Sequence, residues 1–117
     1  MILAILDDLM FTSKIKTAAG QLGVPVAFAR SRAAALDHMR RTPPGLVILD
    51  LNNPRTDPLG VVADMKADPA LASIPTVGFA SHVETDLIDA ARRAGVGDVL
   101  ARGAFTTRLA DILTGRR

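Results

Sequence analysis

LVILDLNNPRTDP, residues 46–58, contains the transition on which the interpretation of this chain depends. Four apolar residues lead to a single carboxylate, Asp50, and the chain then continues into asparagine, proline and aspartate. A short apolar run of this kind is typical of a buried strand, and the first polar residue after it marks the edge of the core. Asp50 is therefore either the ordinary polar end of a strand or part of a functional site. The other residues of the chain help to distinguish these two alternatives.

Short apolar runs alternate with longer, alanine-rich amphipathic segments along the chain. The pattern predicts strands at 2–6, 24–28, 46–49, 74–79 and 99–101. It predicts helices at 12–22, 58–67, 83–94 and 105–113. A further helix is predicted to begin after a cap at Ser31 and to end at the Thr-Pro-Pro-Gly segment 42–45. Strict alternation implies a parallel sheet with helices on both faces, and right-handed crossovers make it doubly wound. We expect a flavodoxin-like (βα)5 three-layer sandwich with a five-stranded parallel sheet.

The length and composition indicate one domain covering 1–117. The chain has 117 residues, 49% of them apolar, and no cysteine, which excludes disulfides and thiolate metal sites. No apolar run approaches the roughly 20 residues that span a bilayer, and the N-terminus lacks the basic start of a secretory signal. We therefore expect a cytoplasmic protein with no membrane segment.

Arginine supplies most of the positive charge, but the basic residues are scattered among 12 acids and the net charge is only +2. Nucleic-acid surfaces usually concentrate their charge in one stripe and often add aromatic stacking residues. This chain has no Trp or Tyr and four Phe. The pattern favours solvated helix faces over direct nucleic-acid binding.

Polar residues follow the predicted strands where open α/β sheets place their chemistry. Asp7 and Asp8 follow the first strand, and Asp50 and Asn52 follow the third. If strands one and three are neighbours, three unpaired carboxylates converge on one edge of the sheet and repel one another. Mg²⁺ prefers one or two carboxylates with waters and a phosphate, so the cluster suggests a Mg²⁺ site for phosphoryl chemistry. For Asp7 and Asp8 alone, an acidic start to a helix explains the pair equally well.

The chain resembles the receiver domains of two-component response regulators over essentially its whole length. The matching segments are ILDD at 5–8, LVILDLNNP at 46–54, ADPALASIPTV at 67–77 and AARRAGVGDVLAR at 90–102. The resemblance implies that Asp50 is the phosphoacceptor and that Asp7 and Asp8 bind Mg²⁺ with it. It also implies that Asn52 offers its backbone carbonyl to the metal while its side chain faces the attacking water.

The resemblance further implies a signalling module rather than an enzyme. Its phosphodonor would be a histidine kinase or a phosphotransfer protein, and its output would pass to a downstream protein partner. No output domain follows the last predicted helix, so we expect a stand-alone partner-binding protein. Homodimerisation through the last two helices is implied by the resemblance only.

Three positions depart from the family pattern. Ala80 stands where the family has a Thr or Ser hydroxyl after the fourth strand; Ser81, one residue later, is a candidate for that phosphate contact. Ser81 and Glu84 also fit a capping box, an alternative role for the serine. Arg102 stands where the family has lysine, and its guanidinium can grip a phosphoryl group. Val99 replaces the family's switch aromatic on the fifth strand.

The residues leave two functions open. Asp50 accepts a phosphoryl group in a Mg²⁺-dependent phosphorelay, or the chain is a pseudo-receiver that binds partners independently of phosphorylation. A flavodoxin-like cofactor binder is disfavoured, because the loop after the first strand carries two acids instead of a phosphate cradle. A dehalogenase-type phosphatase is also disfavoured, because it would carry Asp-x-Asp there and these acids are adjacent.

Overall fold

The computed structural model describes residues 1–116 and contains five strands. They are β1 (Ile2–Ile5), β2 (Val26–Ala29), β3 (Leu46–Asp50), β4 (Thr76–Ala80) and β5 (Asp98–Ala101). All neighbours pair in parallel, in the order β2-β1-β3-β4-β5. This arrangement confirms the predicted flavodoxin-like sheet and makes β1 and β3 neighbours.

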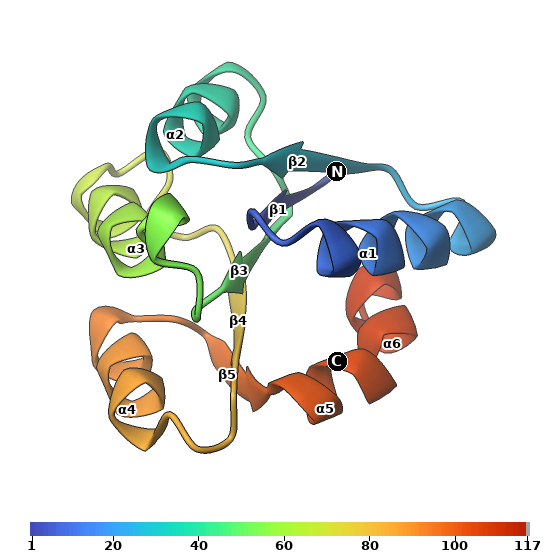
Figure 1. The fold of residues 1–117 in the computed structure, drawn as a ribbon. Helices are drawn as coiled ribbons and strands as arrows, with labels where there is room; N and C mark the ends of the chain where they lie inside the picture. Colours follow the sequence, from blue (N-terminus) through green and yellow to red (C-terminus); the bar gives the residue numbers. More distant parts are fainter. Residues whose placement is uncertain (117) are drawn as a thin grey trace.

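Helices cover both faces of the sheet (Figure 1). They are α1 (Leu9–Leu22), α2 (Arg32–Arg41), α3 (Pro58–Ala67), α4 (Thr85–Ala94), α5 (Arg102–Thr107) and α6 (Leu109–Thr114), with a short 3-10 turn η1 (Pro54–Thr56). In Figure 1, α2, α3 and α4 lie on one side of the sheet, and α1, α5 and α6 lie on the other. None of the helices in the described part of the chain is long and apolar enough to cross a membrane.

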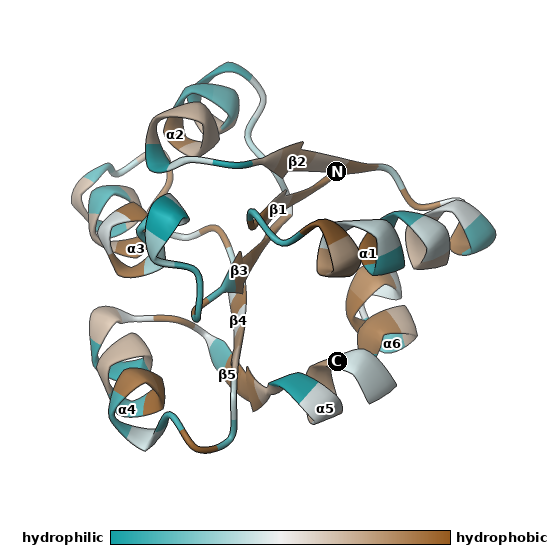
Figure 2. Cartoon of the chain, viewed as in Figure 1, coloured by the Kyte–Doolittle hydropathy of each residue, from teal (hydrophilic) through white to brown (hydrophobic). Residues whose placement is uncertain are grey.

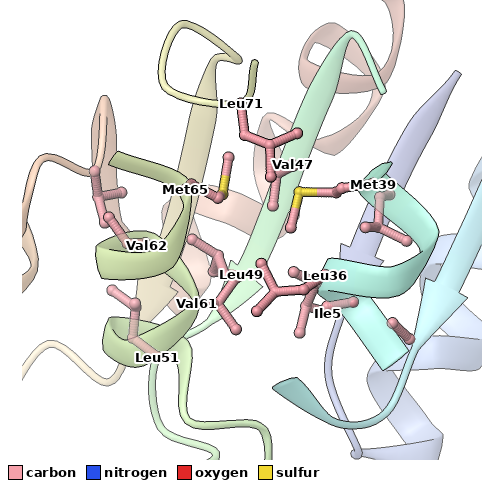
Figure 3. Close-up of a cluster of buried hydrophobic side chains, with 14 of the residues drawn as sticks. Ile5, Leu36, Met39, Val47, Leu49, Leu51, Val61, Val62, Met65 and Leu71 are labelled. Atoms are coloured by element: carbon pink, nitrogen blue, oxygen red, sulfur yellow. The ribbon is translucent and has the colours of Figure 1, made fainter. Parts of the chain in front are cut away.

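The two faces of the sheet bury two separate apolar clusters. Successive residues of a strand point to opposite faces, so Leu3 and Ile5 join one cluster and Ala4 joins the other. The first cluster fills the space under α2 and α3, where Figure 3 shows Met39 and Met65 packed around β1 and β3. Burial on both faces explains why the strands are continuous apolar runs, which Figure 2 shows in brown through the centre of the molecule.

Several helix ends are those that the sequence predicts. Ser31 caps α2 by accepting a hydrogen bond from the Ala34 N–H at 3.1 Å. Helix α3 has the predicted bounds, with Pro58 in its first turn. Helix α1 ends at Gly23, whose positive φ of 68° suits glycine because no side chain opposes it.

Several predicted boundaries are wrong. Strands β2 and β4 each begin two residues later than predicted, and three helical segments also differ. Helix α1 begins at Leu9 instead of Thr12, because the side chain of Asp8 caps it. The segment predicted as one closing helix is divided into α5 and α6 at Arg108. Helix α4 begins at Thr85, after an N-cap residue, Glu84, whose side chain makes no capping hydrogen bond.

Ser81 is consequently not the N-cap of α4, and the predicted capping box does not form. The carbonyl of Ser81 instead accepts a hydrogen bond from the Glu84 N–H in a turn that precedes the helix. Its own N–H donates to the side chain of Asn52 at 2.6 Å. A contact between two loops thus takes the place of the local cap.

Candidate functional site

A hollow of about 220 Å³ opens at the carboxyl end of β1 and β3. It is lined by Asp7, Asp8, Asp50, Asn52, Asn53, Pro54, Arg55 and Arg102. Ile5 pairs with Leu49 across the two strands, so the residues that follow each strand emerge side by side. The structure therefore brings together five of the six site residues proposed from the sequence. Ser81 does not line the hollow, although its backbone is bonded to Asn52, which does.

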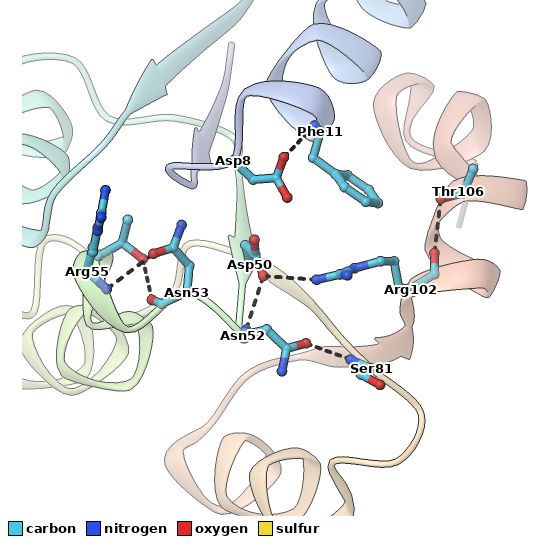
Figure 4. Close-up of polar contacts among 10 residues, drawn as sticks. Asp8, Phe11, Asp50, Asn52, Asn53, Arg55, Ser81, Arg102 and Thr106 are labelled. Atoms are coloured by element: carbon cyan, nitrogen blue, oxygen red, sulfur yellow. Dashed lines mark hydrogen bonds and ion pairs between the residues drawn. The ribbon is translucent and has the colours of Figure 1, made fainter.

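Asp50 is the last residue of β3 and is 3% exposed. Its Oδ1 accepts a hydrogen bond from the Asn52 N–H at 3.0 Å and lies 4.0 Å from Nη2 of Arg102 (Figure 4). Burial raises the pKa of the Asp50 carboxyl, while the Asn52 N–H and the Arg102 charge oppose that rise and the charge of Asp8 adds to it. Asp50 is therefore a buried carboxylate with one nearby cation.

Asp7 is not an unpaired carboxylate, which corrects the prediction of three mutually repelling acids. Its Oδ1 accepts from Nε of Arg30 at 2.8 Å, and its Oδ2 accepts from Nη1 of Arg55 at 3.1 Å. These hydrogen bonds hold the pKa of Asp7 below its usual value. Arg30 directly follows β2 and Arg55 belongs to η1, so two further segments of the chain converge on this residue.

Asp8 has the helix-start role that the sequence left open for the acidic pair, and it also lines the hollow. Its Oδ1 accepts from the Phe11 N–H at 3.1 Å as the N-cap of α1. A carboxylate at this place satisfies a free backbone donor and favours the helix dipole. Its charge also reaches Asp50, since it contributes to the raised pKa of that residue.

Arg102 begins α5 and lies between Asp50 and an aromatic stack. Its Cζ is 5.3 Å from the ring centroid of Phe11, within the range of a cation–π contact. The Phe11 ring stacks on Phe79 at 4.9 Å between centroids, and Phe79 stacks on Phe105 at 4.3 Å. Within residues 1–116, the buried Nε of Arg102 has no hydrogen-bond partner. The guanidinium therefore keeps donors free close to Asp50.

Asn52 connects the hollow to the segment after β4. Its Oδ1 accepts the Ser81 N–H at 2.6 Å, as Figure 4 shows, so the side-chain oxygen is already engaged. Ala80 is fully buried at the end of β4, and Val99 is half-buried on β5. Neither side chain carries the hydroxyl or aromatic ring expected from the family pattern.

The oxygen donors at the hollow form a small set that fits Mg²⁺. Within residues 1–116, no group of three or more His, Asp or Glu side chains is arranged to hold a metal ion. Asp8 and Asp50 remain as carboxylates that line the hollow and lie outside the ion pairs of Asp7. Mg²⁺ commonly takes one or two carboxylates and completes its shell with water, so the chemistry of Asp8 and Asp50 is compatible with Mg²⁺.

Solved response regulators have similar structures. The phosphorylated cyanobacterial phytochrome response regulator RcpA is 26% identical, with a TM-score of 0.81 over 97% of this chain and 88% of that chain. The Mn²⁺-bound response regulator Rcp1 is 25% identical, with a TM-score of 0.74 over the same shares. The receiver domain of NtrX from Brucella abortus, 21% identical, has the same fold, with a TM-score of 0.82 over 99% of this chain and 97% of that chain.

No protein-family model and no curated protein matches the sequence. The resemblance to response-regulator receivers is nevertheless confirmed, because this chain shares the fold of these regulators over 97% and 99% of its length, with TM-scores of 0.81 and 0.82.

Proposed function

We propose that the protein is a phosphorelay receiver in which Asp50 accepts a phosphoryl group and the phosphorylated chain signals through a protein partner. The observation that carries this proposal is the placement of Asp50, a 3% exposed carboxylate beside a hollow of about 220 Å³ and 4.0 Å from a cation. The phosphorylated state named for RcpA and the Mn²⁺-bound state named for Rcp1 support it.

The proposed reaction is a single displacement at phosphorus. An ionised oxygen of Asp50 attacks a phosphohistidine or an acyl phosphate, forming a new O–P bond as the bond to the donor breaks. The leaving group takes the bonding electron pair: a carboxylate leaves as the anion from an acyl phosphate, and the imidazole nitrogen from phosphohistidine takes up a proton from water. An aspartyl phosphate remains. Arg102 offers N–H groups to the phosphoryl oxygens. Mg²⁺ held by Asp8, Asp50 and the Asn52 carbonyl would neutralise charge on the transferring group.

The proposed phosphodonor is a histidine kinase or a phosphotransfer protein in the cytoplasm. The chain acts there as a phosphoacceptor and a signalling module, with no catalytic turnover of its own. Its output is binding to a downstream protein, without direct contact to nucleic acid or membrane.

A second candidate, a pseudo-receiver that binds its partner without phosphorylation, is favoured by the surroundings of β4 and β5. Ala80 offers no hydroxyl to a phosphoryl group, and Val99 offers no ring that could change its position. The backbone N–H of Ser81 is also already bonded to Asn52. In this candidate, the acids and arginines of the hollow maintain the shape of a binding surface.

Intact mass after incubation with Mg²⁺ and acetyl phosphate tests the first candidate against the second. We expect one phosphoryl adduct on the wild-type protein, retained in Asp98→Asn and lost in Asp50→Asn. Asp98 is an exposed acid at the start of β5 and serves as the matched control. Absence of an adduct on the wild type, under conditions that phosphorylate a known receiver, would contradict the proposal and favour the second candidate.

Amide NMR with Mg²⁺ and beryllofluoride adds a readout of signalling. If the first candidate is correct, the NMR signals of the Ser81 amide and of the α4 amides shift when the phosphoryl analogue binds. Changes restricted to the hollow would mean that phosphorylation occurs without a structural response.

A further inference from the structure

Asp7 is the most completely paired carboxylate of the hollow. Arg30 contacts its Oδ1 through both Nε and Nη2 at 2.8 Å, and Arg55 contacts its Oδ2 at 3.1 Å. The Asp7 side chain is 9% exposed, whereas those of Arg30 and Arg55 are 69% and 81% exposed. A largely enclosed acid is thus held by two arginines that reach it from solvent.

The charges around the hollow balance in the absence of a cation. Asp7, Asp8 and Asp50 supply three negative charges, and Arg30, Arg55 and Arg102 supply three positive charges. Three unpaired acids would repel one another and favour a divalent cation strongly. The arginines already neutralise these acids, so the electrostatic free energy gained when a divalent cation binds at this site is smaller.

We propose that Arg30 and Arg55 keep the Asp7 carboxylate engaged, so that a divalent cation binding in the hollow competes with these two ion pairs for Asp7. This inference deepens the proposed function, because it assumes that the hollow binds Mg²⁺. The cation first meets Asp8 and Asp50, and Asp7 becomes available only when its arginines leave. Arg30 and Arg55 thereby set the Mg²⁺ concentration at which the site fills.

The exposure of the two arginines limits the size of the effect. Exposed ion pairs are weak, and breaking one changes an equilibrium constant by no more than about fivefold. The pairs can therefore be displaced by a cation at a high concentration. Their removal should tighten Mg²⁺ binding measurably without converting the hollow into a high-affinity site.

The test is a titration with Mg²⁺ alone, followed by amide NMR in the absence of any phosphodonor. We expect Arg30→Gln and Arg55→Gln each to bind Mg²⁺ about two- to fivefold more tightly, and the double variant roughly tenfold. Arg55→Lys, which keeps a positive charge, should remain close to the wild type. Arg41→Gln removes the same charge from the far end of α2 and is the matched control.

The Asp7→Asn background separates competition for Asp7 from a general effect of charge. If the arginines act by holding Asp7, most of the gain from removing them disappears in Asp7→Asn. An equal gain in that background, or an unchanged or weaker affinity in the double variant, would overturn the proposal. Thermal unfolding of each variant in chelator establishes that it is folded.

The titration also keeps this proposal distinct from the proposed function. If neither the wild type nor the double variant binds Mg²⁺, both the competition and the proposed Mg²⁺ site are wrong. If Mg²⁺ binds with the expected order of affinities but acetyl phosphate gives no adduct, the phosphorelay proposal fails and the competition stands.

Discussion

The contact between Arg102 and Asp50 predicts a coupling that a double-mutant cycle can measure. The perturbations are Arg102→Gln, Asp50→Asn and their combination. The charged atoms lie 4.0 Å apart. At that separation, the electrostatic attraction between two unit charges is about 1 kcal/mol in water and about 4 kcal/mol at an effective dielectric constant of 20. The Arg102 side chain is 42% exposed, so solvent screens the pair, and we expect a coupling of about 1–2 kcal/mol.

The coupling should depend on pH with a defined sign. Burial raises the pKa of Asp50 above its ordinary value, so the carboxyl takes up a proton in the folded state at a higher pH than an exposed aspartate does. The attraction to Arg102 requires the ionised form. It is therefore present at pH 7 and decreases as the pH falls through the raised pKa.

Urea unfolding at pH 7 and at about pH 4, with chelator and low salt, gives the four free energies of the cycle at each pH. We expect Arg102→Gln to destabilise the wild type at pH 7 and to have much less effect in the Asp50→Asn background. A coupling within about 0.3 kcal/mol of zero at pH 7 would refute the reasoning. A coupling that is equally large in acid would refute the assignment to an ionised Asp50.

Three further predictions concern single substitutions. Asp50→Asn should unfold at a higher temperature than the wild type at pH 7 in chelator, because ionising a group with a raised folded-state pKa reduces stability. The gain in melting temperature should shrink as the pH falls through the raised pKa of Asp50 towards the ordinary aspartate value. Phe11→Leu should lower the free energy of unfolding by about 1 kcal/mol and change the Nε–H NMR shift of Arg102, since the stacked ring is lost. Asn52→Ala should destabilise by about 1 kcal/mol in urea unfolding and accelerate hydrogen exchange at the Ser81 amide.

The fold could be predicted because each segment carries its own signal. Strands buried on both faces are continuous apolar runs, and the third helix has proline in its first turn. Alternation of strands and helices then leaves few arrangements of the sheet. The predicted start of α1 was wrong because Asp8 serves as a cap, and the exposed Leu9 and Met10 do not follow the apolar face of the helix.

The position of the hollow could be predicted, but its charge balance could not. Residues after parallel strands meet at one edge, so the proximity of Asp8 to Asp50 follows from strand order alone. The pairing of Asp7 depends on the positions that the Arg30 and Arg55 side chains take in the folded chain. No local sequence motif around either arginine indicates that it contacts Asp7. A basic residue directly after a strand is the only signal that could have indicated Arg30.

The capping-box prediction for Ser81 was wrong for a related reason. Its spacing to Glu84 matches a local capping box, but a contact with Asn52, 29 residues away, holds its backbone in another position. The stack of Phe11, Phe79 and Phe105 is likewise formed by isolated residues from α1, β4 and α5. Contacts between distant segments thus determine the details that single-sequence patterns leave open.

Reductive trapping of the acyl phosphate tests the central claim most directly. The protein is incubated with Mg²⁺ and acetyl phosphate and then treated with borohydride, which reduces an aspartyl phosphate to homoserine, and peptide mass spectrometry locates the change. We expect homoserine at position 50 in the wild type and none at Asp7, Asp8 or Asp98. Trapping at another aspartate, or no trapping while a known receiver is trapped in parallel, would contradict the assignment of Asp50 as the phosphoacceptor.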